Sequence, residues 1–443
     1  MKKLWQTDKS NLPDSGAESI RKQVESFTVG NDHLLDQYLL PFDLEASGVH
    51  VRALESAGIL SAEEAAKLQK GLDNILKLWE KGEFGINPEH EDGHTAIEIW
   101  LTEKYGDLGK KIHTGRSRND QVLTAVRLYE KARLKEVLHQ TSICALAILG
   151  QANDHESVPM PGYTHTRKAM LSTAGQWLAG YAELLIMQLE ASSGVIKLVN
   201  RSPLGTAAGF GTTISLDRDS ESDLLGFEQP VVSATTAQLS RGWVELQVVQ
   251  YLSNVTSLLS RFASDIIQFS SEAYGFIDID ETYCTGSSIM PNKKNPDVAE
   301  LIRGKHALLT GYEATLQRVT ANLGSGYHRD LQLTKEPVIE AFNTASEILT
   351  LTELLVNGLS FNEKALREAC SNDLLAAERA YKLVKEEGMS FRDAYRKIKS
   401  ESAEDVSIEL ADLFKTYTQL GSPGNIGIDR LMKQVSSFEE GLG

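Results

Sequence analysis

Cysteine is scarce in this chain of 443 residues, which contains only Cys144, Cys284 and Cys370. Their spacing matches neither a metal-binding motif nor a disulfide framework, so we expect no structural disulfides and a reducing compartment. No apolar stretch is long enough to span a bilayer, and the first residues, MKKLWQTDKS, lack the apolar run of a signal peptide. The sequence therefore predicts a cytoplasmic location.

Long runs of basic residues are also missing, and the formal net charge is -16 at pH 7. Nucleic acids and anionic membranes are bound by clustered Lys and Arg, so this charge argues against both as partners. A small anionic substrate is still compatible, because a few cations can be concentrated in a cleft. Hydrophobic residues make up 41% of the chain and charged residues 24%, which is typical of a globular protein.

Glycine and proline are absent from two long segments, 121–149 and 243–274. Apolar residues recur every three or four positions in the second segment, which predicts one helix of roughly 45–50 Å. Residues 143–149 are apolar on all sides, so we expect them to be buried, also against helices of other subunits. The predicted fold is mainly α, with a long central helix bundle in a homo-oligomer. The positions that form the apolar stripe are Val244, Val248, Tyr251, Val255, Leu258, Phe262, Ile266 and Phe269.

Helix-start signals mark further boundaries along the chain. Asn295-Pro296-Asp297 predicts a helix from Pro296 to about Asn322, preceded by a loop from Tyr283 to Lys294. Ser390 and Asp393 are spaced as in a capping box. Periodic runs give way to mixed segments near 112 and 360. We therefore expect three domains: an N-terminal helical domain (1–112), a central helix bundle (113–360) and a small C-terminal helical domain (361–443).

Five segments combine small, polar and charged residues in a way that packing alone does not require. They lie far apart in the sequence. They are EDGHTAIE (91–98), HTGRSRNDQ (113–121), MPGYTHTRK (160–168), TGSSIMPNKKNPD (285–297) and YHRDLQLTKE (327–336).

The segment 285–297 has the composition of an oxyanion site. A glycine-led loop with two hydroxyls, two ammonium groups and an amide suits the binding of a carboxylate. It also suits the extra negative charge that forms when a proton leaves the adjacent carbon. The alternative is an ordinary solvated turn before a helix.

Arg116 and Arg118 lie two residues apart among Gly, Ser and Asn. Guanidinium groups in such a setting suit fork-like recognition of carboxylates. A surface turn with ordinary arginines is the alternative.

Two histidines are candidates for proton transfer. His165 lies between two threonines, and a neutral imidazole suits this chemistry near neutral pH if a carboxylate orients its other nitrogen. His94 and Glu98 are spaced as a metal pair would be. No Cys lies nearby, however, and Asp92 and Glu91 are better explained as helix caps or histidine partners, so we expect no metal site. A structural role is the alternative for both histidines.

No cofactor motif is evident. The Gly-rich segment 205–213 resembles a phosphate loop only superficially, since the required strand, helix start and later acid are not apparent. We therefore expect no dinucleotide and no other cofactor.

Taken together, the five segments resemble the fumarase and aspartase superfamily, and within it the argininosuccinate lyase family. SSIMPxKxNP points to the superfamily, whereas HTGRSRNDQ, MPGYTH, the double lysine before NPD and YxxDLQxxKE point to the narrower family. The resemblance covers nearly the whole chain. It implies a three-domain helical homotetramer whose active sites are shared between subunits. It also implies reversible cleavage of argininosuccinate to L-arginine and fumarate in arginine biosynthesis, without metal or cofactor.

The resemblance also implies roles for individual residues. Ser287 would be the catalytic serine, and Lys293 with Asn295 would stabilise the doubly charged carboxylate. His165 would be the acid or relay residue, oriented by Glu300. Whether Ser287 or His165 takes the first proton stays open. The implied substrate-binding residues are Thr164, Ser117, Arg118 and Asn119 for the succinyl part, and Thr28, Asp32, Tyr327, Gln332 and Lys335 for the amino-acid end.

The chain departs from the family pattern at a few positions. Residues 5–8 lack the family's Gly pair and Arg, Gly93 replaces a valine, and Asn292 replaces a glutamine. Thr166-Arg167 replaces Leu-Gln. We interpret these changes as a divergent subgroup, with a modified substrate as the alternative. Other members of the superfamily (adenylosuccinate lyase, fumarase and aspartase) and a catalytically silent helical protein are the remaining alternatives.

Overall fold

The structure is a computed structural model that describes residues 14–400 and 413–442. The first thirteen residues, including the unusual segment 5–8, lie outside the described residues. The described chain is mainly helical, as predicted, and divides into two compact units. Unit 1 comprises residues 1–132, 196–246 and 315–339, and unit 2 comprises 133–195, 247–314 and 340–443. The predicted joints near 112 and 360 stay a prediction.

Five long helices contribute segments to both units. They are α6 (Arg118–Asp154), α7 (Ala174–Val199), α10 (Trp243–Ser270), α11 (Asp297–Thr320) and α12 (Lys335–Asn357).

Unit 1 adds the first helices of the chain and several short elements. These are α1 (Asp14–Val29), α2 (Asp32–Ser56), α3 (Ala62–Glu80), η1 (Pro88–His90), α4 (Gly93–Tyr105), α5 (Asp107–Lys110), η2 (Lys111–His113), β3 (Arg201–Ser202), α8 (Arg218–Leu224), β4 (Gln229–Pro230), α9 (Ala234–Ser240) and η4 (Arg329–Thr334).

Unit 2 adds short strands and the last helices. These are β1 (Pro159–Thr164), β2 (Arg167–Thr173), β5 (Ile277–Ile279), η3 (Glu281–Tyr283), β6 (Thr285–Gly286), β7 (Lys294–Asn295), β8 (Leu359–Phe361), α13 (Glu363–Ala369), η5 (Asn372–Leu375), α14 (Ala376–Glu387), α15 (Phe391–Ser400) and α17 (Ile428–Leu442).

The packing of α2, α3 and α4 forms an apolar core in unit 1. Ser61 starts α3 with a capping box, in which its side chain accepts from Glu64 N and the Glu64 carboxylate accepts from Ser61 N. Gly71 lets α3 approach α4 closely, since a Cβ there would lie 2.5 Å from Leu101. The buried residues of this core include Leu40, Leu54, Leu68, Leu72, Ile75, Ile97 and Leu101.

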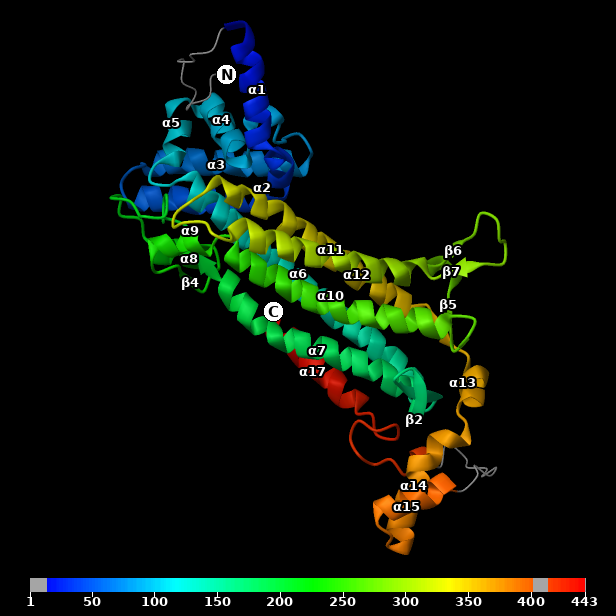
Figure 1. The fold of residues 1–443 in the computed structure, drawn as a ribbon. Coiled ribbons are helices and arrows are strands. Elements are labelled where there is room, and N and C mark those ends of the chain that lie inside the picture. Colours follow the sequence, from blue (N-terminus) through cyan, green and yellow to red (C-terminus); the bar gives the residue numbers. More distant parts are fainter. Residues whose placement is uncertain (1–13, 401–412, 443) are drawn as a thin grey trace. The chain divides into compact units, whose positions relative to one another are not determined.

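The long helices run side by side in unit 2 (Figure 1). Trp177 of α7 packs against Phe262 of α10, with ring centroids 5.4 Å apart. Trp177 Nε1 also donates to Asp265 of α10 at 3.0 Å. Between α12 and α6, Ser346 Oγ donates to Gln140 Oε1 at 2.8 Å. Apolar contacts and buried polar pairs thus both hold the bundle.

The predicted long helices are confirmed with small shifts at their ends. The segment 243–274 is helical as α10, which ends at Ser270, and seven of its eight stripe residues are buried, with Leu258 only partly so. The segment 121–149 lies within the longer α6. Burial of 143–149 is incomplete within one chain, because Ile143 and Leu146 are each 39% exposed. Their burial against other subunits stays a prediction.

The region before α11 corrects one prediction. We expected a loop over 283–294, but β6 pairs antiparallel with β7, with Thr285 opposite Asn295 and Gly286 opposite Lys294. Thr285 N also donates to the Asp297 carboxylate at 3.0 Å, so the first turn of α11 holds the base of this small hairpin. The helix itself starts at Asp297, one residue after the predicted position.

The capping box predicted before α15 is half confirmed. Asp393 N donates to Ser390 Oγ at 3.2 Å, as expected. The Asp393 carboxylate, however, accepts from the Ser390 hydroxyl at 2.6 Å.

Among the described helices, none is long and apolar enough to cross a membrane.

We predict that Ser61→Ala lowers the free energy of unfolding by about 1 kcal/mol, because the cap of α3 loses its acceptor. Urea unfolding followed by circular dichroism measures the change. Ser233→Ala is the matched control, since Ser233 precedes α9 without a side-chain cap hydrogen bond. Equal effects of the two changes would contradict the role of the Ser61 cap.

Candidate active site

Unit 1 contains a pocket of about 390 Å³ in which residues from five regions of the sequence meet. Seven of the predicted substrate-binding residues line it, whereas Ser117 does not. The lining residues are Thr28, Val29, Asp32, Glu91, Asp92, His94, Arg118, Asn119, Val122, Arg241, Tyr327, Arg329, Gln332 and Lys335.

The corner between α1 and α2 forms one wall of the pocket and is held by η4. Gln332 Nε2 donates to the carbonyl oxygens of Thr28 and Val29, at 3.1 and 3.0 Å. Arg329 Nη2 donates to the same Thr28 carbonyl at 2.6 Å. The last carbonyls of a helix have no partner within it, so these side chains satisfy the end of α1.

Lys335, the first residue of α12, lies buried between two carboxylates of α2. Its Nζ is 2.7 Å from Asp36 Oδ1 and 2.9 Å from Asp32 Oδ1. Burial by itself would lower the pKa of Lys335, but Asp36 and Asp32 raise it above its ordinary value. Burial raises the pKa of Asp32, which Lys335 only partly offsets. One cation therefore keeps two neighbouring acids together in the interior.

Asp36 also links this trio to α4, because its Oδ2 accepts from Gly93 N at 2.9 Å. A Cβ at Gly93 would lie 3.5 Å from Asp36 Cβ and 3.3 Å from Ile86 Cδ1, so little room is left for a larger residue. Gly93, noted as a departure in the sequence, is thus the first residue of α4 and lies directly on the trio.

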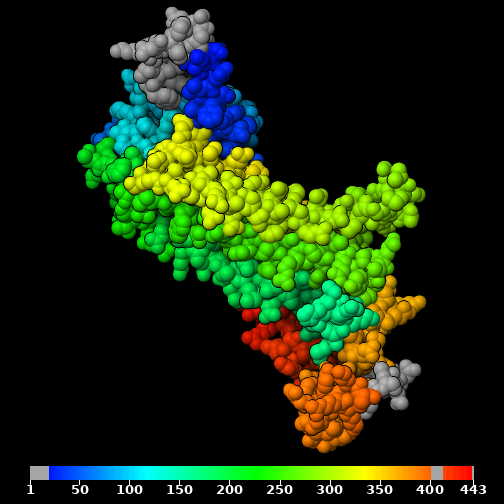
Figure 2. Space-filling model, in the orientation of Figure 1, coloured from blue at the N-terminus to red at the C-terminus, as the bar shows by residue number. Residues whose placement is uncertain are grey.

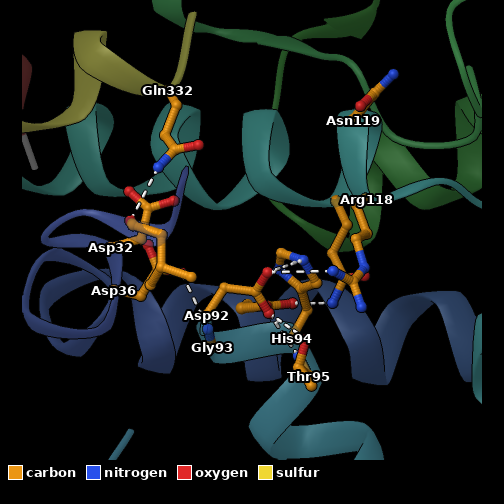
Figure 3. Close-up of polar contacts among 12 residues, drawn as sticks. Asp32, Asp36, Asp92, Gly93, His94, Thr95, Arg118, Asn119 and Gln332 are labelled. Atoms are coloured by element: carbon orange, nitrogen blue, oxygen red, sulfur yellow. Dashed lines mark hydrogen bonds and ion pairs between the residues drawn. The ribbon is translucent and has the colours of Figure 1, made fainter. Parts of the chain in front are cut away.

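Asp92 gathers three partners at the start of α4 (Figure 3). Its Oδ1 accepts from Thr95 N at 2.9 Å, and its Oδ2 lies 3.0 Å from His94 Nε2 and 3.3 Å from Arg118 Nη1. Burial by itself would raise the pKa of Asp92, but His94, Arg118 and Thr95 together lower it well below its usual range. The prediction that Asp92 is a helix cap and a histidine partner is confirmed.

The first turn of α6 brings Arg118 and Asn119 into the pocket. Asp120 fixes this turn, because its Oδ1 accepts from Ser117 N at 2.9 Å and its Oδ2 from Ala207 N at 2.7 Å. Burial raises the pKa of Asp120 to about 6, although the two backbone donors oppose this rise. The Gly-rich segment 205–213 is therefore anchored to α6 through a carboxylate.

The two arginines of HTGRSRNDQ have different surroundings. Arg116 is buried, and its Nη1 donates to Ser47 Oγ at 2.9 Å. Only Arg118 lines the pocket, so the pair does not form a joint fork.

Sequence reasoning missed two residues of this region. Asp36 lies one helical turn after Asp32, and that i, i+4 spacing was an available signal. Arg241 lies between two helices in a segment without a motif, so nothing local pointed to it.

The remaining predicted residues belong to unit 2. Thr164 and His165 lie at the tip of the β1–β2 hairpin, where His165 and Thr166 form a two-residue turn with φ values of 52° and 58°. Positive φ at both positions is typical of a type I′ hairpin turn and is unusual for a β-branched residue such as Thr166. His165 is exposed, and within the described chain its imidazole has no hydrogen-bond partner.

Ser287, Lys293 and Asn295 lie on the β6–β7 hairpin, which stands clear of its neighbouring helices (Figure 2). Ser287 Oγ accepts from Met290 N at 3.1 Å, which closes a tight turn. Lys293 is exposed. Glu300 lies in the first turn of α11 and is also exposed.

The pocket therefore groups seven of the nine predicted recognition residues, whereas Ser287 and His165 lie on exposed hairpins of unit 2. Asp32 and Asp92 supply carboxylates, Arg118 and Arg241 supply guanidinium groups, and Asn119 supplies an amide. Such a mixture suits a ligand with both carboxylate and ammonium groups.

Comparisons with known proteins identify relatives that match most of the chain. A family profile described as "Lyase" matches residues 21–311. The chain is 40% identical over 433 residues to an argininosuccinate lyase from Sorangium cellulosum, covering 98% of each chain. It is also 40% identical to the argininosuccinate lyase of Thermotoga neapolitana, covering 86% of this chain and 95% of that one.

Solved structures show the same fold at lower identity. An EDDS lyase in complex with formate superposes with a TM-score of 0.79 at 23% identity, covering 94% of this chain and 91% of that one. A class II fumarase from Schistosoma mansoni has a TM-score of 0.72 at 15% identity, covering 86% and 92%. The predicted fumarase-like helical fold is confirmed.

We predict that Asp92→Asn lowers the free energy of unfolding by about 3 kcal/mol at pH 7, because it leaves Arg118 and His94 beside a neutral amide. The folded pKa of Asp92 lies below its unfolded value of ~3.9, so this contribution is present above pH ~4 and is lost as the pH falls further. The difference from wild type should therefore shrink between pH 4 and pH 2.

Urea unfolding at several pH values measures this difference. Asp107→Asn is the control, because Asp107 is an exposed partner of Lys110 and its loss should have little effect. A deficit in Asp92→Asn that is the same at pH 7 and pH 2 would show that the charge of Asp92 is not its cause.

Proposed function

The chain belongs to the argininosuccinate lyase family, and we propose that it catalyses the reversible elimination of argininosuccinate to L-arginine and fumarate. The observation that carries this proposal is the pocket of unit 1, which is lined by the carboxylates of Asp32 and Asp92 and by the guanidinium groups of Arg118 and Arg241. Argininosuccinate has matching groups, since it joins a succinyl dicarboxylate to a guanidino amino acid. The proposed setting is arginine biosynthesis.

The proposed recognition follows from these charges. Arg118 and Asn119, on the first turn of α6, bind the succinyl part together with Ser117 and with Thr164 of the β1–β2 hairpin. Support comes from the anchoring of that turn by Asp120, which reduces the freedom of the two pocket side chains.

The amino-acid end is proposed to bind near the corner of α1 and α2. Asp32, Lys335, Gln332, Tyr327 and Thr28 are the residues that we assign to it. Their support is that η4 and α12 are held on this corner by the bonds of Gln332 and Lys335.

The difficult step is removal of a proton from the carbon beside a succinyl carboxylate. We assign the removal of this proton to Ser287. Lys293 and Asn295 then stabilise the doubly charged carboxylate that results. The bond from the neighbouring carbon to the guanidine nitrogen then breaks, and its electron pair leaves with arginine. An exposed ammonium on a hairpin anchored by Asp297 supports this role for Lys293.

His165 is assigned the second proton transfer, to the departing guanidine, with Glu300 orienting the imidazole. A relay histidine needs a partner for its other nitrogen. Because the imidazole of His165 lacks one within the described chain, we propose that its site is completed when chains assemble. The proposed assembly is a homotetramer whose active sites are shared between three subunits, and the exposed Ile143 and Leu146 of α6 support burial between chains.

The proposed location is the cytoplasm. Its support is the sparse set of three cysteines, which are free in the structure.

We predict that the purified protein converts argininosuccinate to equimolar arginine and fumarate in the presence of a chelator. Fumarate is followed by its ultraviolet absorbance and arginine by amino-acid analysis. Adenylosuccinate and aspartate serve as comparison substrates. Turnover of either comparison substrate without turnover of argininosuccinate would overturn the substrate assignment.

We further predict that Ser287→Ala and His165→Asn each lower kcat by at least ~10²-fold, the lower range for the loss of a proton-transfer group. His139→Asn and Ser436→Ala are the matched controls, since both residues lie on the surface of unit 2. A near-normal rate in either site variant would remove that residue from the mechanism.

Mixing the two inactive variants tests the shared site. Subunits that exchange between Ser287→Ala and His165→Asn tetramers should restore part of the wild-type rate, because some sites then receive both intact residues. Light scattering of the mixture checks the oligomeric state. No recovery after demonstrated subunit exchange would contradict the sharing of sites.

A further inference from the structure

Among the described cations of the pocket, Arg241 differs because its guanidinium is buried without a carboxylate partner, whereas Arg329, which also lacks one, is exposed and bonds to the Thr28 carbonyl. The side chain of Arg241 is 5% exposed and lines the pocket of unit 1. Over the described part of the chain it makes no side-chain hydrogen bond or ion pair. Its guanidinium lies instead over the ring of Tyr327, with Cζ 5.2 Å from the ring centroid. A buried charge without a counterion is costly, so this guanidinium is suited to an anion supplied by a ligand.

The backbone fixes the position of Arg241. Arg241 is the C-cap residue that follows α9, and Gly242 comes next with a φ of +81°. A Cβ at Gly242 would lie 2.2 Å from Thr320 Cγ2, so only glycine fits between Arg241 and α10. Gly242 N also donates to Glu245 Oε2 at 2.6 Å. The guanidinium is therefore presented to the pocket by a backbone with little freedom.

The neighbouring charges point to the kind of anion. Lys335 is already bound by Asp32 and Asp36, and one ammonium between two carboxylates leaves a net negative formal charge. That set favours a cation of the ligand, such as an α-ammonium group, over an anion. Arg118 lies against Asp92 in the same way. Among the described residues, Arg241 is therefore left as the buried cation of the pocket whose charge no side chain neutralises, because Arg329 is exposed to solvent.

We propose that Arg241 recognises the α-carboxylate of the arginine moiety, with Tyr327 as its platform, while Asp32 recognises the α-ammonium. Lys335 is then a positioning residue that holds the two acids together. This proposal rests on the proposed function, because it assigns the amino-acid end of that substrate. A guanidinium fork binds a carboxylate through two parallel hydrogen bonds, which gives both affinity and orientation.

The test compares arginine with agmatine, which is arginine without the α-carboxylate, by calorimetry on the full-length protein. Wild type should bind arginine roughly 10²-fold more tightly than agmatine, the range for a lost charge-assisted pair. In Arg241→Gln this preference should fall to within about threefold, mainly through weaker arginine binding. Arg241→Lys keeps the charge but not the fork, so it should retain an intermediate preference of about tenfold.

Arg201→Gln is the matched control, because Arg201 is an exposed arginine of unit 1 outside the pocket, and it should keep the wild-type preference. The reverse reaction adds a second measurement. Arg241→Gln should raise KM for arginine or agmatine selectively and leave KM for fumarate unchanged. A raised KM for fumarate alone would place Arg241 at the succinyl end and overturn the proposal.

Equal binding of arginine and agmatine by wild type would overturn the proposal without any variant, so it is testable even if Arg241→Gln does not fold. The binding measurement is also independent of turnover. An Arg241-dependent preference in a protein that does not cleave argininosuccinate would support this assignment and contradict the proposed function. Cleavage of argininosuccinate, together with an unchanged preference for arginine in Arg241→Gln, would support the proposed function and contradict the assignment of Arg241.

Discussion

The ion pairs of Lys335 with Asp32 and Asp36 hold together the part of unit 1 on which the pocket depends. Lys335 is 4% exposed, and it joins the start of α12 to the start of α2, 299 residues away from Asp36 in the sequence. Without the ammonium, two carboxylates would face each other in the interior, which is strongly unfavourable. Asp36 also accepts a hydrogen bond from Gly93 N, so the same ion pairs help to fix the first turn of α4.

The same constraint shapes the chemistry of the pocket. The single positive charge of Lys335 is outweighed by the two carboxylates that it binds. The neighbourhood of this lysine therefore attracts cations. At the start of α4, Asp92 offsets Arg118 in a similar way. The pocket therefore offers an acidic set around Lys335 that attracts a cation and a buried guanidinium, Arg241, that attracts an anion, and these charges can help to orient a zwitterionic ligand.

Local patterns in the sequence were sufficient to predict the long helices. The apolar stripe of α10 follows the helical period, and the residues Pro296 and Asp297 mark the start of α11, so both signals act within a few turns. The β1–β2 hairpin gave no such signal. Its turn has neither Gly nor Asn, and Thr166 adopts positive φ although β-branched residues rarely do. The ladder of the strands and the surrounding packing must impose this turn.

Recognition residues were predictable where they lie in a dense motif, and were missed where they depend on tertiary packing. Arg118, Asn119, Tyr327 and Gln332 belong to two short segments whose composition is unusual, and the structure brings them to one pocket.

Arg241 has no such context, since its importance arises from the lack of a carboxylate partner among the described residues, and a missing contact leaves no pattern in the sequence. Gly242 is the nearest signal, because a glycine that starts a long helix suggests a close backbone approach. Its reason lies in Thr320, which the chain reaches 78 residues later. The capacity of Arg241 to bind an anion therefore depends on tertiary packing, which buries its guanidinium beside Tyr327 without a carboxylate from the described chain.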